Sequence, residues 1–214
     1  MSSSGEPEAG SIPAKAKYHH GDLREALIFA VLKLVQEQGA DNFSLADACR
    51  QAGVSTAAPY RHFRDRNEIL AEVSARGFAM LNQMAAEAVE RHGKGTQESI
   101  TEMATNYVKF AVEQQGLFRL MFGQNPALTA DPLVRETGRT CFGYLINHIS
   151  NYCEANGFEG DVHDIALKLW TFVHGAASLL IDEKYETVVE ALDVDRLIAT
   201  ATPSLLRQEA SLKN

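Results

Sequence analysis

The chain has 214 residues, of which 45% are hydrophobic and 22% charged, proportions that fit an ordinary globular protein rather than a fibrous or unstructured one. Its formal net charge of −8 excludes a protein that coats nucleic acid through bulk positive charge. No apolar run approaches about 18 residues and no charged-then-apolar leader is present, so we expect neither a membrane span nor a signal peptide.

The charge is unevenly distributed along the chain. Residues 14–67 hold eight Lys and Arg against six Asp and Glu, whereas residues 68–214 hold twelve basic and twenty acidic residues. Basic side chains therefore concentrate in a small N-terminal unit, and this local excess is the kind of signal that accompanies nucleic-acid binding.

Three cysteines, Cys49, Cys141 and Cys153, form no C-x-x-C pair and leave an odd thiol. We interpret them as reduced, buried, small hydrophobic residues of a cytoplasmic protein, with a redox sensor as the less favoured alternative.

The first 17 residues are rich in Ser, Gly, Glu, Pro and Ala and lack apolar periodicity, so they are predicted to be a disordered tail. Lys15 and Lys17 could form an arm that touches DNA, although a solvated tail is the simpler interpretation. Asp22 is then predicted to cap a helix that runs to about Gln38 with one apolar stripe.

The next stretch, FSLADACRQAGVSTAAPYRHF (residues 43–63), predicts two short helices joined by a tight turn. Ser44 suits the N-cap of a helix over 45–52, and Gly53 suits its end, where a positive φ is needed. Ser55 is then predicted to cap a second helix over 56–63. Small residues between the two helices allow the close, steep crossing of a helix-turn-helix.

The second of these helices has a polar and basic face that suits the major groove of DNA. Its first residues, Thr56 and Ala57, are candidates for contact with base edges, Ala57 through a thymine methyl group. The competing interpretation is that these two residues merely lie close to the DNA backbone and do not contact the bases.

At this point the sequence resembles the TetR family of bacterial transcription regulators, through AGVSTAAPYRHFRDRNEIL (residues 52–70). The resemblance implies phosphate contacts from Tyr60, His62 and Arg66. Pro59 and Arg66 stand where many members have Leu and Lys, and Ala46 stands where many have a DNA-contacting Arg. The predicted DNA-binding set is Ser44, Ser55, Thr56, Ala57, Tyr60, Arg61, His62 and Arg66.

The rest of the chain shows helical periodicity and no strand signal. Helices are predicted over 67–92, 96–114, 133–156, 162–182 and 194–207, with a short apolar turn at 117–122 and a loop at 123–130. The predicted fold is all-α with about nine helices. Its parts are a tail (1–17), a helix-turn-helix domain (18–66) and a helical ligand-binding and dimerisation domain (67–214).

An apolar ligand pocket is predicted in the last of these domains. Trp170 and His174 lie four residues apart on one helical face, and such a set can line a pocket with one polar group that orients a ligand. The segment WTFVHG (residues 170–175) resembles the Trp-His-Gly type of C-terminal domain found in one branch of the family. Plain core is the alternative. The predicted ligand-binding set is Tyr107, Phe118, Met121, Phe122, Trp170 and His174.

Catalytic and metal-binding patterns are missing from the sequence: it has no G-x-S-x-G, H-E-x-x-H or phosphate loop. We therefore expect no enzyme, no metal and no cofactor. The expected partners are a double-stranded, palindromic DNA operator, an unidentified small apolar effector and a second copy of the chain, paired through its two C-terminal helices. A helical ligand-binding or interaction protein without operator binding is the alternative function.

Overall fold

The computed structural model describes residues 20–207, and within that range it contains nine α-helices, two 3₁₀-helices and no strand. The predicted tail, with Lys15 and Lys17, lies outside the described residues. The helices are α1 (His20–Gln38), α2 (Leu45–Ala52), η1 (Pro59–Arg61), α3 (Arg66–His92), α4 (Gln97–Glu113), α5 (Gln115–Phe122), α6 (Pro126–Thr129), α7 (Pro132–Asn156), α8 (Val162–Ile181), η2 (Tyr185–Thr187) and α9 (Val194–Arg207). The prediction of an all-α fold is confirmed.

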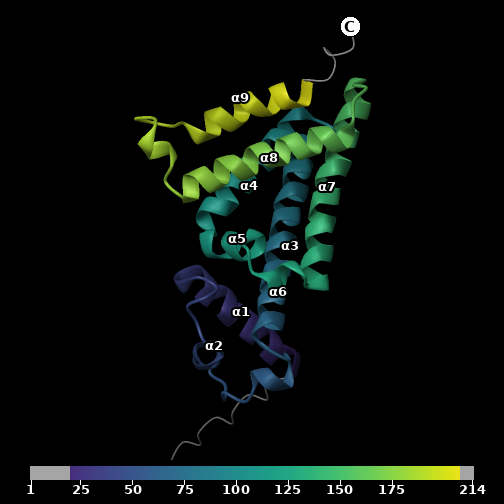
Figure 1. Ribbon diagram of the computed structural model, residues 1–214. Coiled ribbons are helices and arrows are strands. Elements are labelled where there is room, and N and C mark those ends of the chain that lie inside the picture. Colours follow the sequence, from purple (N-terminus) through teal and green to yellow (C-terminus); the bar gives the residue numbers. More distant parts are fainter. Residues whose placement is uncertain (1–19, 208–214) are drawn as a thin grey trace, which may run out of the picture.

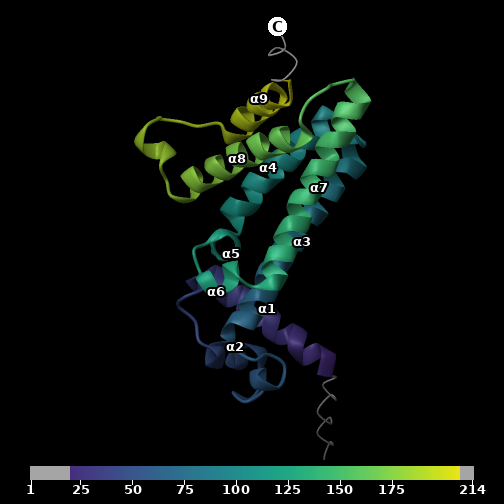
Figure 2. The same cartoon turned by 45° about the vertical axis from the view of Figure 1, so that its right-hand side comes forward.

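The molecule is elongated, with a small head at one end and a larger body at the other (Figures 1 and 2). We call α1, α2, η1 and the first turns of α3 the head, and the remaining helices the body. Helix α3 leaves the head and runs alongside α7, while α8 and α9 cross the far end above α4. One helix therefore belongs to both parts.

Helix α1 begins earlier than the sequence suggested. The structure starts it at His20, so Asp22 lies in its first turn and the predicted cap at Asp22 is wrong. The apolar stripe is as expected: Leu27, Val31 and Val35 are completely buried and form the centre of the head together with Phe43 and Phe63.

Helix α3 is a continuous rod of 27 residues, which at 1.5 Å per residue spans about 40 Å. Asp65 caps its N-terminus by accepting a hydrogen bond from the backbone N–H of Glu68 at 3.0 Å. Gly77, in its middle, lies under Met121 and Leu117 of α5, where a side chain would collide with both. The glycine therefore serves close helix packing and does not interrupt the rod.

Head and body also meet where α1 contacts α5. The apolar turn expected at 117–122 is part of this complete helix, and the loop expected at 123–130 contains the short helix α6. A Cβ on Gly116 would lie 2.9 Å from the Cα of Gln36 and closer still to the carbonyl oxygen of Val35. The Gln36 side chain accepts a hydrogen bond from the Leu117 N–H at 3.0 Å and donates another to the side chain of Gln114.

Helix α8 is the one helix between residues 20 and 207 whose length and composition would allow it to cross a membrane. Core helices of water-soluble proteins meet the same criterion, and α8 packs against α4, α7 and α9. Packing within the protomer buries 33% of the apolar window of α8, and Leu167 and Leu179 remain exposed.

Candidate DNA-binding head and ligand cavity

The first helix of the helix-turn-helix has the limits that the sequence predicted. The Ser44 hydroxyl accepts a hydrogen bond from the Asp47 N–H at 3.2 Å, and the Asp47 carboxylate accepts one from the Ser44 N–H at 2.9 Å. This reciprocal pair satisfies two donors at the helix start. The Ser44 hydroxyl also donates to the Asp47 carboxylate at 2.6 Å, and this bond, followed by the one from the Ser44 N–H, holds the pKa of the Asp47 carboxyl below its usual value. At the other end Gly53 has φ of 68°, the left-handed conformation expected of it.

The second element is shorter than predicted. Residues 56–63 do not form an α-helix; they form turns followed by the 3₁₀-helix η1, Pro59–Arg61. Pro59 is the physical reason, because it has no N–H to donate and its ring crowds the carbonyl four residues earlier. The Ser55 side chain makes no cap; instead its backbone carbonyl accepts a hydrogen bond from the Ala58 N–H at 3.0 Å.

Most of the predicted DNA-contacting residues are exposed. Ala58, Pro59 and Phe63 are buried against the head core and so fix the orientation of the segment. Tyr60 is 67% exposed. His62 and Arg66 are half-buried, whereas the other members of the set are exposed: Ser44, Ser55, Thr56, Ala57, Tyr60 and Arg61.

The arginines of this surface differ in their partners. Arg50 pairs with Asp47, and Arg64 pairs with Glu68 at 3.0 Å. Arg66 donates to the carbonyl oxygen of Ala40 and lies over the Phe43 ring, 4.6 Å from its centroid. Of the Lys and Arg described in the head, Arg61 is the one with no ion pair or hydrogen bond within the chain, which leaves its guanidinium available to a phosphate.

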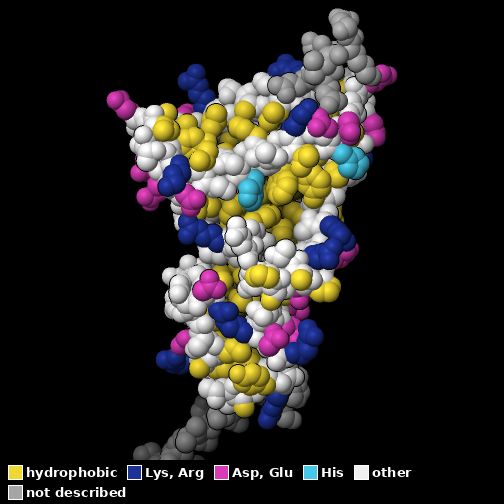
Figure 3. Space-filling view, in the orientation of Figure 1, with side chains coloured by type: hydrophobic (Ala, Val, Ile, Leu, Met, Phe, Trp, Pro, Cys, Tyr) yellow, Lys and Arg dark blue, Asp and Glu magenta, His cyan; other side chains and the backbone are white. Residues whose placement is uncertain are grey.

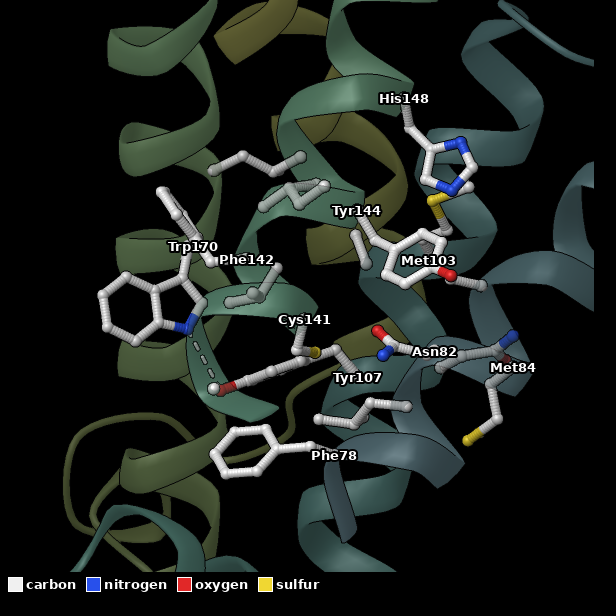
Figure 4. Close-up of a pocket in the computed structure, with 18 of the residues that line it drawn as sticks. Phe78, Asn82, Met84, Met103, Tyr107, Cys141, Phe142, Tyr144, His148 and Trp170 are labelled. Carbon is white, nitrogen blue, oxygen red and sulfur yellow. Dashed lines mark hydrogen bonds between the residues drawn. The ribbon is translucent and has the colours of Figure 1, made fainter. Parts of the chain in front are cut away.

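The body contains a cavity of about 420 Å³, within the range of about 300–1,000 Å³ that is usual for small-molecule sites. Its walls come from α3, α4, α5, α7 and α8, and they are mostly apolar (Figure 4). In the space-filling view, hydrophobic side chains gather in the hollow beneath α8 and between α5 and α7 (Figure 3). The cavity is therefore partly open to solvent and suited to a largely apolar molecule.

The predicted ligand residues divide into two groups. Tyr107, Phe122 and Trp170 line the cavity, whereas Phe118 and Met121 are buried in the core and His174 lies behind Tyr107. Sequence reasoning missed the contributions of α3 and α7, which supply more than half of the lining: Phe78, Leu81, Asn82, Met84, Ala85, Gly138, Arg139, Cys141, Phe142, Tyr144, Leu145 and His148. One feature of the sequence could have indicated these lining positions: a few polar residues, such as Asn82 and His148, interrupt otherwise apolar helix faces.

Tyr107, Trp170 and His174 form a hydrogen-bonded cluster at one side of the cavity. The Trp170 Nε1–H donates to the Tyr107 oxygen at 3.3 Å, and that oxygen lies 2.9 Å from the Nδ1 atom of His174. Burial raises the pKa of Tyr107 and lowers the pKa of His174, so both are neutral and the tyrosine hydroxyl can donate to the imidazole. The indole N–H, the tyrosine hydroxyl and the Nδ1 atom of this cluster thus have partners within the protein.

No group of three or more His, Cys, Asp or Glu that could hold a metal ion occurs among the residues described.

Two family models match the chain. Residues 27–73 match "Bacterial regulatory proteins, tetR family", and residues 100–204 match "Tetracyclin repressor-like, C-terminal domain". A helix-turn-helix head on a helical body with an apolar cavity is the architecture of a one-component regulator. The chain belongs to the TetR family of bacterial regulatory proteins.

Individual relatives agree with this assignment. A protein of unknown function from Rhodococcus sp. RHA1 is 31% identical, with a TM-score of 0.76 over 90% of this chain and 98% of that one. An uncharacterised HTH-type transcriptional regulator of Haemophilus influenzae is 29% identical over 103 residues, so the match spans 48% of this chain and 50% of that curated relative. The transcriptional regulator FadR of Bacillus subtilis, solved in complex with stearoyl-CoA, shares the fold at 13% identity, with a TM-score of 0.64 over 85% of this chain and 95% of that one.

Proposed function

We propose that this chain is a ligand-responsive transcriptional regulator, a cytoplasmic repressor that binds a palindromic operator as a homodimer and is released by a small, largely apolar effector. The observation that carries the proposal is the physical connection between an exposed helix-turn-helix and an apolar cavity through one helix, α3. The domain limits 18–66 and 67–214 remain a proposal from the sequence, and the limit between them falls in the first turn of α3, a helix that contributes to both head and body.

The DNA-binding surface is proposed to centre on the segment 55–62. Thr56 and Ala57 are exposed at its start and can approach base edges, while Tyr60 and Arg61 can contact the sugar-phosphate backbone. Arg66 is tied to Ala40 and Phe43, so its proposed part in phosphate binding requires that it exchange or share these contacts. We therefore place Arg61 ahead of Arg66 as the source of positive charge.

The dimer interface is proposed to lie on α8 and α9, where apolar side chains are visible on the surface (Figure 3). Among the small residues of α8, Ala176 and Ala177 are buried inside the protomer, so they do not contribute to this surface. Leu167, Thr171 and Leu179 of α8 are exposed instead, and half-buried Gly175 completes this stripe at a spacing of four residues. Space is open around Gly175, which would allow a second helix to approach closely.

We propose that ligand binding in the body is transmitted to the head through α3, because this helix belongs to both parts. Phe78 and Asn82 of this helix line the cavity, and its first residue, Arg66, lies in the head. An effector can shift DNA binding only if its affinity differs between the DNA-competent and DNA-incompetent arrangements of the two heads. At about 1.5 Å per residue, α3 is about 40 Å long. A small tilt of so long a helix would displace the two heads relative to successive major grooves.

The test is binding of the full-length protein to DNA from upstream of its own gene, measured by fluorescence anisotropy over a salt titration. We expect Arg61→Ala to weaken binding to all sequences and to lower the salt slope by about one, because one phosphate contact is lost. Arg50→Ala, which removes an arginine already paired with Asp47, is the matched control and should change the slope less.

Two results would count against the proposal. If the purified protein shows no preference for any segment of that DNA while still binding small molecules, the alternative of a helical ligand-binding protein without an operator would replace it. If Arg61→Ala binds with wild-type affinity and salt slope, the DNA-binding surface lies elsewhere on the head.

A further inference from the structure

The polar groups around the cavity form two sets that differ in their hydrogen bonding. On one side, Tyr107, Trp170 and His174 satisfy one another, as described above. On the other side, the Nδ1 atom of His148 is inaccessible to solvent and has no partner, and the side-chain amide of Asn82 has none among the described residues either. Figure 4 shows Asn82, Tyr144 and His148 on the side of the cavity opposite Trp170.

An unpartnered buried polar atom is costly, because it has given up its hydrogen bonds to water and received none in exchange. The protein tolerates this cost at His148 on α7 while avoiding it on the α8 side. The Asn82 amide is half-buried and forms no hydrogen bond among the described residues, so a ligand oxygen can bond to it in place of water. The Nδ1 atom of His148 is closed to solvent, so it meets a ligand oxygen only when the imidazole ring turns toward the cavity. These two side chains give the cavity a preference for ligands that carry a hydrogen-bonding oxygen.

The same surroundings disfavour charge on the ligand. Burial raises the pKa of the Cys141 thiol to about 11, and burial followed by the nearby positive charge of Lys94 lowers the pKa of His148, so both are neutral. Arg139 is the one Lys or Arg in the cavity lining, and it is exposed. It precedes His148 by nine residues on α7, about 13 Å along the helix axis, so it cannot neutralise an anion held beside His148.

We propose that the cavity takes an uncharged, largely apolar ligand whose hydroxyl or carbonyl oxygen is hydrogen-bonded by Asn82 and His148. This rests on the proposed function only in treating the cavity as the effector site. A carboxylate in the same place would lose its hydration without gaining an ion pair with the cavity wall, because Lys94 is not part of the lining and Arg139 is too distant, and this is the more costly exchange. Asn82 and His148 accordingly select the ligand, and the apolar walls supply most of the affinity.

Three probes of equal chain length test this inference: 1-decanol, 2-decanone and decanoate. Their binding to the full-length protein is measured by calorimetry and by Trp170 fluorescence, in the absence of DNA. We expect the alcohol and the ketone to bind at least tenfold more tightly than the acid. Asn82→Leu, which keeps the side-chain volume but removes the amide, should weaken binding of 1-decanol about three- to tenfold, the value of one net hydrogen bond.

A structural role for Asn82 is separated from a ligand-binding role by the melting temperature of the ligand-free protein. Because Asn82 has no partner in the chain, Asn82→Leu should leave that temperature unchanged or raise it while lowering ligand affinity. His148→Phe should behave in the same way and provides a second variant if the first does not fold. Arg135→Gln, at an exposed position of α7 outside the cavity lining, is the control and should leave the affinity for 1-decanol unchanged.

The inference is overturned if decanoate binds as tightly as 1-decanol and loses that affinity in Arg139→Gln, since the cavity would then select anions. It is also overturned if the affinities of both Asn82→Leu and His148→Phe equal that of the wild type, or if 1-decanol does not bind at millimolar concentration. A probe that binds with the expected pattern but leaves operator affinity unaltered would contradict the proposed regulatory function and leave the ligand class intact.

Discussion

The head and the body use their interiors in opposite ways. In the head, the buried side chains of α1, α2 and α3 form a closed core, and most of the arginines at its surface are held by ion pairs or by a backbone carbonyl. In the body, longer helices enclose a cavity, and one buried nitrogen of a lining residue, Nδ1 of His148, lacks a partner.

This contrast shows where each part gives up stability for function. A surface that reads DNA must hold its side chains at fixed spacing, which close packing and local hydrogen bonds provide. A site that senses a molecule must contain space before the molecule arrives, so its lining residues forgo contacts that a filled core would have. We therefore expect the head to tolerate substitutions of buried residues less well than the body does.

The largest expected difference between head and body is the loss of stability when a buried side chain is shortened. Leu27→Ala removes a completely buried side chain from the head and should lower the free energy of unfolding by about 2–5 kcal/mol. Leu145→Ala, in the cavity lining, should cost less, because Leu145 already borders empty space. Chemical denaturation of the ligand-free variants measures both, and equal losses would show that the body is as tightly filled as the head.

A second, smaller effect is expected where the two parts touch. Gly116→Ala would push a methyl group against Val35 and Gln36 of α1 and should destabilise the protein by about 1–3 kcal/mol. Gly143→Ala is the matched control, since that glycine lies in the interior of α7 with open space around it and should gain up to about 1 kcal/mol. Thermal unfolding distinguishes them, and a neutral Gly116→Ala would mean that α1 and α5 separate easily.

The smallest expected effect is the pH dependence of stability that arises from the histidines near the cavity. Burial lowers the pKa of His174, so below an ordinary pKa of about 6.5 the unfolded chain takes up a proton that the folded chain resists. The stability from neutral His174 is complete above pH 6.5 and declines as the pH falls below it. His148 contributes in the same direction.

His174→Gln should therefore lose less stability than the wild type between pH 7.5 and pH 5.5. Denaturation at the two pH values gives the difference for each protein. A variant whose loss matches that of the wild type would indicate that the Tyr107–His174 contact does not depend on a neutral imidazole.

Local signals in the sequence predicted the helix limits well. Ser44 and Gly53 marked α2, the predicted range 133–156 differs from α7 by one residue, and the predicted start of α9 at Val194 is confirmed, because caps and periodicity act within a few residues. The same reasoning failed at residues 56–63, where a single proline outweighed the helical pattern, and at the start of α1, where Asp22 was mistaken for a cap.

The cavity could be predicted only in part. Aromatic residues with helical spacing identified Trp170 and Tyr107, but Phe118 and Met121 belong to the same pattern and are core. Which face of a helix borders empty space depends on how α3, α7 and α8 cross, and that geometry is set by contacts between residues far apart in the chain. The partners of Arg66 were missed for the same reason, since Ala40 and Phe43 precede it by more than twenty positions.

The continuity of α3 has a consequence for cooperativity. Ile69 and Leu70 lie in the head, Phe78 and Leu81 lie in the body, and all four belong to one uninterrupted hydrophobic cluster. Because the helix cannot melt in one part without exposing apolar surface in the other, the protein should unfold in a single transition rather than domain by domain. A molecule bound in the body would then shield the head from unfolding and proteolysis even when no operator is present.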